Sequence, residues 1–170
     1  MNLEIKKTHI GWDWGLIVNG KGYSCCESLD SVEKALEAGS KKLLELLPKE
    51  TFDFGDGPVP AHRHKNGGGW VANTARVGNS VYIGSGARVY GEAEVVDNAQ
   101  ILDHARVYEN AVVRENTIIR DNARVFGNAC ISGNAEVAEF AHILGQSRLS
   151  GLVKICGTIC FHGASLYGEN

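Results

Sequence analysis

A strict six-residue period governs the second half of the sequence and limits what the chain can fold into. Every sixth position from Val71 to Phe161 holds an aliphatic or aromatic residue, without one exception. A small or branched residue, in most cases Ala, stands two places before it, and Gly, Asp or Glu followed by Asn usually stand two and three places after it. A fixed period of this kind indicates a repeat architecture. The repeated positions are Val71, Val77, Ile83, Val89, Val95, Ile101, Val107, Val113, Ile119, Val125, Ile131, Val137, Ile143, Leu149, Ile155 and Phe161.

Six residues are enough for one short strand and one corner. Two inward positions alternate with two outward ones, as in a strand, and the remaining two residues turn the chain. We expect Gly and Asn to adopt the corner conformation, because both tolerate unusual backbone angles, and we expect corner Asp and Glu to keep the corners solvated. Three such strands close a triangular coil of eighteen residues, and about five coils stack, each contacting only its neighbours. The period is expected to continue to Tyr167.

This pattern resembles the left-handed parallel β-helix of the hexapeptide-repeat proteins, and the resemblance covers about 100 of the 170 residues. The left-handed winding is implied by the resemblance alone, because parallel crossover connections are otherwise right-handed. The resemblance also implies a homo-oligomer, usually a trimer. The segment NGGGWV at 66–71 is similar to the start of the repeat in an uncharacterised bacterial group often called YdcK-like. The expected fold class is therefore mainly β.

The first 50 residues have a different character and predict a small α+β unit, a β-hairpin plus a helix. Asn19-Gly20 is a hairpin turn signal, because a type I′ turn needs positive φ at both central residues. A helix is expected to begin near Asp30 or Ser31, which can cap free N–H groups, and to end before Pro48. The strands are expected over 3–9, 13–18 and 22–26.

Residues 51–69 contain Gly, Pro and His without a period, which predicts a linker. The expected organisation is thus an accessory domain over 1–50, a linker over 51–69 and a β-helix over 70–170.

One motif recurs at an interval of eighteen residues: ARVYGE, ARVYEN and ARVFGN begin at Ala87, Ala105 and Ala123. Residues one coil apart lie above one another at the strand spacing of about 4.8 Å. One outward surface is therefore expected to carry an Arg column beside an aromatic column. We call it the Arg/aromatic face, and its members are Trp70, Arg88, Tyr90, Arg106, Tyr108, Arg124 and Phe126.

Three interpretations of the Arg/aromatic face stay open. The stacked side chains can simply stabilise neighbouring strands, although Arg above Arg is repulsive unless an anion lies beside it. The face can also be a subunit interface, because Tyr, Trp, Phe and Arg are enriched there. Finally, it can be an anionic ligand site, in which guanidinium groups bind phosphate or carboxylate and the rings stack on a base.

The same resemblance implies candidate catalytic residues. The best-known hexapeptide-repeat proteins are acyltransferases that use acyl-CoA and a His general base, which would make His142 and His162 the catalytic candidates here. Their active sites often include a loop that leaves a coil, whereas these hexads run from 71 to 161 without an insertion. His142, Cys160 and His162 are also weak metal candidates, but a zinc site needs three or four convergent ligands. No metal site is therefore predicted, and a corner residue, His104, is expected to be solvated.

Charge and composition exclude some function classes. Residues 1–70 hold 9 basic and 10 acidic residues and residues 71–170 hold 8 and 10, so no basic half favours nucleic acid. No stretch approaches the roughly 18 apolar residues of a membrane span. The five Cys are odd in number, and the N-terminus lacks a secretory apolar segment, so a cytoplasmic location is expected.

These features favour a non-catalytic, oligomeric β-helix protein that binds a small anionic, nucleotide-like ligand or a protein partner along the Arg/aromatic face. The first alternative is a trimeric acyl-CoA-dependent acyltransferase, and the second is a purely structural assembly protein. The cofactor is unknown, and acyl-CoA applies only to the transferase alternative.

Overall fold

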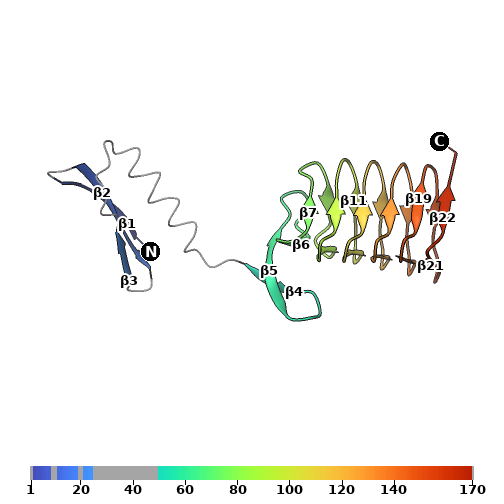
Figure 1. Ribbon diagram of the computed structural model, residues 1–170, viewed down its shortest axis with the longest axis horizontal. Coiled ribbons are helices and arrows are strands. Elements are labelled where there is room, and N and C mark those ends of the chain that lie inside the picture. The colour runs from blue at the N-terminus through green and yellow to red at the C-terminus, as the bar shows by residue number, and fades with distance from the viewer. Residues whose placement is uncertain (1, 9–10, 19–20, 25–49, 170) are drawn as a thin grey trace. The chain divides into compact units, whose positions relative to one another are not determined.

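The chain divides into two compact units, Met1–Lys49 and Glu50–Asn170. The computed structural model describes residues 2–8, 11–18, 21–24 and 50–169 (Figure 1). No helix in these ranges is long and apolar enough to cross a membrane.

The first unit contains an antiparallel sheet in the order β1-β2-β3, close to the three expected strands. Thr8 pairs with Gly11, and Val18 pairs with Lys21. The expected turn at Asn19-Gly20 and the expected helix after Asp30 lie outside the described residues. The strands are β1 (Asn2–Thr8), β2 (Gly11–Val18) and β3 (Lys21–Ser24).

The second unit is a parallel β-solenoid of about five coils, in which three sheets each receive one strand per coil (Figure 1). The first sheet contains β6 (Trp70–Ala72), β9 (Arg88–Val89), β12 (Arg106–Val107), β15 (Arg124–Val125), β18 (His142–Leu144) and β21 (Cys160–His162). The second sheet contains β7 (Arg76–Val77), β10 (Glu94–Val95), β13 (Val112–Val113), β16 (Cys130–Ile131), β19 (Arg148–Ser150) and β22 (Ser165–Tyr167). The third sheet contains β8 (Tyr82–Ile83), β11 (Gln100–Ile101), β14 (Ile118–Ile119), β17 (Glu136–Val137) and β20 (Lys154–Ile155).

The coil length is the one that the period predicts. Val107 pairs with Val89 below it and Val125 above it, each eighteen residues away. The backbone follows the same interval, since the Arg106 N–H donates to the Ala123 carbonyl at 3.0 Å. Each coil is therefore bonded to the next along the whole repeat.

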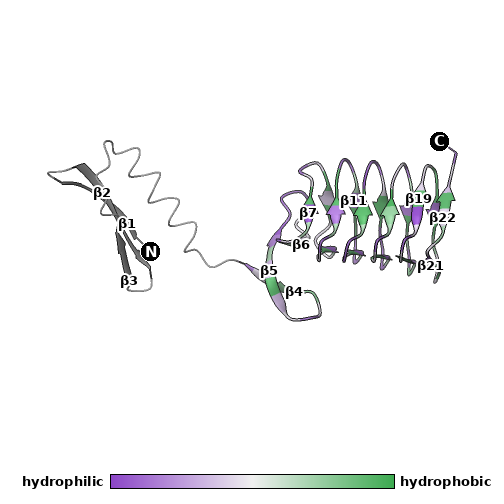
Figure 2. Cartoon of the chain, in the orientation of Figure 1, coloured by the Kyte–Doolittle hydropathy of each residue, from purple (hydrophilic) through white to green (hydrophobic). Residues whose placement is uncertain are grey.

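The core runs through the centre of the coils as a ladder of aliphatic side chains. Ile83, Ile101 and Ile119 stack on the third sheet and are fully buried, and the small residues two places earlier, such as Ala99, are buried too. Polar and apolar segments consequently alternate around each coil (Figure 2). The burial of the aliphatic and small positions confirms the division into inward and outward positions.

The corners confirm the expectation for Gly, which adopts positive φ at several of them, but not for Asn. Positive φ falls on the first corner residue, which is Asp or Glu as often as Gly, and not on the Asn that follows. At five of the six acidic corners a hydrogen bond compensates for this backbone conformation, because the carboxylate accepts the backbone N–H of the residue one coil above. Asp121 bonds the Glu139 N–H at 3.0 Å, and Glu109 bonds the Gly127 N–H at 2.8 Å. The acidic residues with positive φ are Asp97, Asp103, Glu109, Glu115, Asp121 and Glu139.

The segment predicted to be a linker, 51–69, contains two strands, β4 (Thr51–Asp53) and β5 (Pro58–Arg63). They form an antiparallel hairpin, and β5 extends the first sheet by pairing with β6. Burial explains why these residues are ordered as strands: Phe54 and Ala61 pack with Ala72 in a second, small core.

The last coil is one residue shorter than the period predicts. Leu166, and not Tyr167, pairs with Leu149, which is seventeen residues earlier. The Arg148 N–H accordingly donates to the Ala164 carbonyl. Leucine suits this aliphatic position, while the Tyr167 side chain is 72% exposed. The expectation that the hexads continue to Tyr167 is therefore wrong.

Candidate ligand-binding face

The outward surface of the first sheet brings the predicted Arg column together. Arg106 pairs in register with Arg88 on one side and Arg124 on the other. Trp70 precedes Arg88 in this column, and His142 follows Arg124. Arg is thus placed directly above Arg across three adjacent strands, as on no other sheet of the described solenoid.

The aromatic column lies beside it on the same sheet. The rings of Tyr90 and Tyr108 stack with centroids 4.9 Å apart, and those of Tyr108 and Phe126 are 4.8 Å apart, with interplanar angles of 2° and 5°. Phe54 stacks on the outer side of Tyr90 at 4.7 Å, and the His142 ring meets Phe126 edge-on at 6.4 Å. The rings therefore form a continuous ladder with both ends covered.

This ladder excludes base stacking between the predicted aromatic residues. A ring inserted between two others needs about 3.5–4.0 Å on each side, or roughly 7–8 Å between the outer rings. The observed spacings of 4.8 and 4.9 Å leave no such gap. Only the ring edges are available to a ligand, so chemistry on this face rests mainly on the arginines.

None of the three guanidinium groups has a carboxylate neighbour among the described residues, and two of them, those of Arg88 and Arg106, contact aromatic side chains. The Arg88 guanidinium lies 5.1 Å from the centre of the Phe52 ring. Within the part of the chain that the structure describes, no carboxylate lies within 4 Å of Arg88, Arg106 or Arg124. The column is therefore a row of positive charge without a counter-ion among those residues.

Arginines on the other two sheets provide the contrast. Arg76 pairs with Glu94 at 3.3 Å, and Arg120 lies 2.6 Å from both Asp121 and Glu136. Lys154 joins the same group by contacting Glu136 at 3.0 Å, and these cations lower the pKa of the Glu136 carboxyl through hydrogen bonding. Arg148 on the second sheet also has no carboxylate within 4 Å among the described residues, but it pairs in register with Cys130 and Ser165 rather than with another arginine. The distinct feature of the column is therefore that three adjacent arginines share a face without a counter-ion among those residues.

Two phenols flank the arginines. Burial raises the pKa of Tyr90, and the guanidinium of Arg106 opposes this shift. Burial is also the largest cause that raises the pKa of Tyr108, followed by the neighbouring Tyr90. Both phenols are therefore neutral at physiological pH and leave the positive charge of the column intact.

The predicted catalytic and metal candidates lie at the far end of this sheet. His142 pairs with Cys160, and Leu144 pairs with His162. His142 is half-buried against Phe126, whereas Cys160 and His162 are exposed. Among the described residues, no three His, Cys, Asp or Glu side chains converge as metal ligands. His142, Cys160 and His162 therefore share a face without forming a metal-ligand group.

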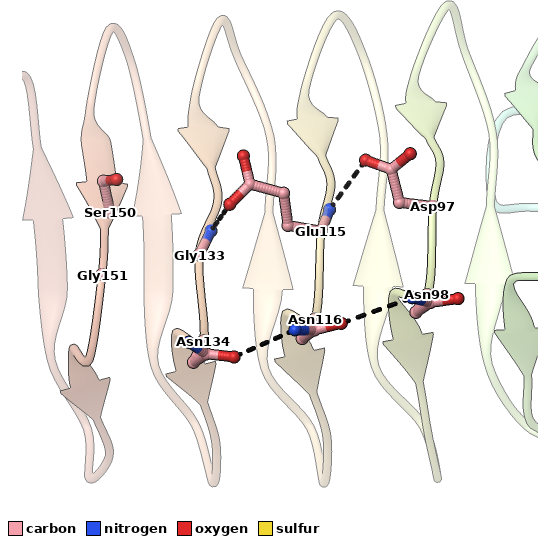
Figure 3. A pocket seen from close by; sticks show the side chains of 8 residues that line it. All are labelled: Asp97, Asn98, Glu115, Asn116, Gly133, Asn134, Ser150 and Gly151. Carbon is pink, nitrogen blue, oxygen red and sulfur yellow. Dashed lines mark hydrogen bonds between the residues drawn. The ribbon is translucent and has the colours of Figure 1, made fainter. Parts of the chain in front are cut away.

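A polar hollow of about 450 Å³ lies along the corner between the second and third sheets (Figure 3). The Asn116 amide donates to Asn134 at 3.1 Å, and Asn98 donates to Asn116 at 3.4 Å. Asp97 accepts the Glu115 N–H, and Glu115 accepts the Gly133 N–H at 2.7 Å. These polar groups bond to one another, so the hollow is a stabilising ladder rather than a ligand site.

Sequence reasoning missed two contributors to the face, Phe52 and Phe54. Phe52 stacks on Trp70 at 4.6 Å, and the Arg63 guanidinium lies 4.4 Å from the centre of the same Trp70 ring. Phe52 and Phe54 alternate with polar residues in TFDFGD, which is a short strand signal. The Gly and Pro residues that follow it are typical of turns and loops, so the sequence pattern predicts a linker there.

No known protein family matches this chain, and no characterised protein is significantly similar to it in sequence. A functional assignment therefore depends on the repeat and on the chemistry of the Arg/aromatic face.

Proposed function

We propose that this protein is a non-catalytic binding protein whose Arg/aromatic face receives an anionic ligand. One observation carries the proposal: Arg88, Arg106 and Arg124 stack on adjacent strands with no carboxylate within 4 Å among the described residues. Like charges on neighbouring strands destabilise a sheet. A bound anion removes that repulsion and gains charge-assisted hydrogen bonds from the guanidinium groups.

Three arginines in a column form two adjacent pairs, so the proposed ligand carries at least two anionic groups, one for each pair. The strand spacing places successive arginines about 4.8 Å apart, so a phosphate or carboxylate between two of them contacts both guanidinium groups. Because the rings are already stacked, recognition does not involve a base inserted between them. A condensed phosphate or a polycarboxylate fits this description better than the nucleotide-like ligand expected from the sequence.

We also propose that the solenoid is left-handed and belongs with the hexapeptide-repeat proteins, including the YdcK-like group. The constant eighteen-residue register from Val71 to Phe161 supports the hexapeptide-repeat part of this proposal, and the left-handed winding rests on the resemblance alone. The same resemblance supports assembly as a homo-oligomer, in the form of a trimer. In such an assembly one outward face of each solenoid lies near a second subunit. Native mass spectrometry counts the subunits and weighs any ligand retained through purification.

The acyltransferase alternative has less support. His142 and His162 remain its candidate bases, with acyl-CoA as the cofactor, but the coils between residues 71 and 161 keep one register and leave no inserted loop to build a pocket. We also propose a cytoplasmic location. The free thiols of Cys130, Cys156 and Cys160 are in keeping with a reducing compartment.

Isothermal titration calorimetry with tripolyphosphate tests the proposed binding. Arg106→Gln removes the central charge and should weaken binding at least tenfold, because one charge-assisted contact is worth about 1.5–3 kcal/mol. Arg148→Gln is the matched control, since Arg148 is exposed on the second sheet and pairs in register with Cys130 and Ser165. Equal affinity of the two variants would reject the face as the site, and no binding by the wild type would favour a purely structural role.

A further inference from the structure

A second candidate site lies between the β4–β5 hairpin and the first two coils, and it borders the Arg/aromatic face through the shared residue Tyr90. It is a cavity of about 300 Å³, at the small end of the range for ligand pockets, which is roughly 300–1,000 Å³. Its walls are mainly apolar and come from elements far apart in the sequence. They include Phe54, Val59, Pro60, Ala72 and Tyr90.

Hydrogen bonds hold the walls of this cavity in place. Asp53 accepts the backbone N–H groups of Gly55 at 2.8 Å and Gly57 at 3.1 Å, which fixes the hairpin loop. The His62 and Asn73 side chains bond at 2.8 Å and tie β5 to the first corner. The cavity is therefore preformed, and a ligand would not have to order the loop on binding.

Most polar groups in the lining are already bonded. The Thr74 hydroxyl donates to the Gly91 carbonyl at 2.6 Å, and the Asn73 side-chain oxygen is bonded to His62. The Asp56 carboxylate, unlike the polar groups of Thr74 and Asn73, has no such partner: no basic group lies within 4 Å of it among the described residues. The cavity thus combines an apolar interior with one unpaired negative charge in its lining.

We propose that this cavity binds a small amine, whose apolar body lies among Phe54, Val59 and Tyr90 and whose ammonium group pairs with Asp56. Val59 is 41% exposed and Phe54 only 7%, so the apolar lining extends from a buried wall to the surface. A ligand body there covers apolar surface that is otherwise in water. The ammonium group gives Asp56 a counter-ion, and the site discriminates against carboxylates. This proposal does not rest on anion binding by the arginines.

The probe is 2-phenylethylamine, compared with 2-phenylethanol and 3-phenylpropionate, which have similar bodies but neutral and negative ends. Titrations of the full chain are followed by backbone amide NMR. The amine should bind tighter than the alcohol and shift the amide signals of Gly57, Thr74 and Gly91, while the propionate should not bind.

Two variants test the roles of charge and cavity. Asp56→Asn should weaken amine binding about tenfold and make the amine and alcohol equal, whereas Val59→Trp should block both by filling the mouth. Glu50→Gln is the control for net charge and should leave the affinity unchanged, because Glu50 does not line the cavity. The proposal is overturned if Asp56→Asn binds the amine as well as the wild type does, or if the shifts fall outside the cavity.

Discussion

Removing the central positive charge of the Arg column should stabilise the ligand-free protein. With the strand spacing of about 4.8 Å as the separation, each neighbouring guanidinium repels Arg106 by about 0.9 kcal/mol in water. Two neighbours, Arg88 and Arg124, act together, and screening at low salt reduces the sum only slightly. Loss of the Arg106 contact with Tyr90 offsets part of the gain. Arg106→Gln should therefore raise the free energy of unfolding by about 0.5–1 kcal/mol at 20 mM salt.

Urea unfolding followed by circular dichroism measures this effect at 20 mM and 500 mM NaCl. The gain should shrink towards zero at the higher salt, where the Debye length falls to about 4 Å. Arg148→Gln should change stability by less than about 0.5 kcal/mol and without salt dependence, because no like charge is adjacent to it in register. A loss of stability in Arg106→Gln at low salt would refute the reasoning and identify the column as a structural element.

Three further predictions concern the core, the corners and the phenols. Ile119→Ala should cost about 3 kcal/mol in urea unfolding, because the side chain is fully buried between coils. Asp121→Ala should cost about 2 kcal/mol and Asp121→Gly about 1 kcal/mol, because both lose the bond to the Glu139 N–H while only Ala also strains a positive φ. The Tyr90 phenol should ionise above pH 10.0 when absorbance is followed at 295 nm, and stability should fall as the pH rises above that value, because the unfolded phenol releases its proton first.

Each of these predictions has a contrary result. A cost below about 1 kcal/mol for Ile119→Ala would mean that the coils repack freely around the gap. Equal stability of Asp121→Ala and Asp121→Gly would mean that backbone strain at positive φ does not contribute to the stability of this corner. Tyr90→Phe should reduce the amplitude of the high-pH phenol transition and leave the part that belongs to Tyr108, whose pKa is also raised. An unchanged amplitude in Tyr90→Phe would assign the transition to other tyrosines.

The repeat was predictable because each residue of a coil contacts the residue eighteen places away. That relation converts a period in the sequence directly into a register, so the period alone aligns Val89, Val107 and Val125. The same logic places Arg106 between Arg88 and Arg124. In a solenoid, the sequence period therefore determines which residues stack on one another in neighbouring coils.

The parts that sequence reasoning missed depend on contacts outside the period. The β4–β5 hairpin is stabilised by packing of Phe52 on Trp70 and Phe54 on Tyr90, across segments with no shared repeat. The corner conformation of Asp121 depends on a backbone N–H one coil above, which propensity for Gly and Asn does not include. The register of Leu166 depends on a turn that is one residue short.

Arginine side-chain NMR during a tripolyphosphate titration tests the central claim most directly. The Nε–Hε signals report each guanidinium separately, and those of Arg106 and Arg124 should shift and saturate together while that of Arg148 stays in place. Saturable shifts confined to the Arg column are the predicted result. Uniform, unsaturated shifts of all arginines, Arg148 included, would contradict a binding site on this face.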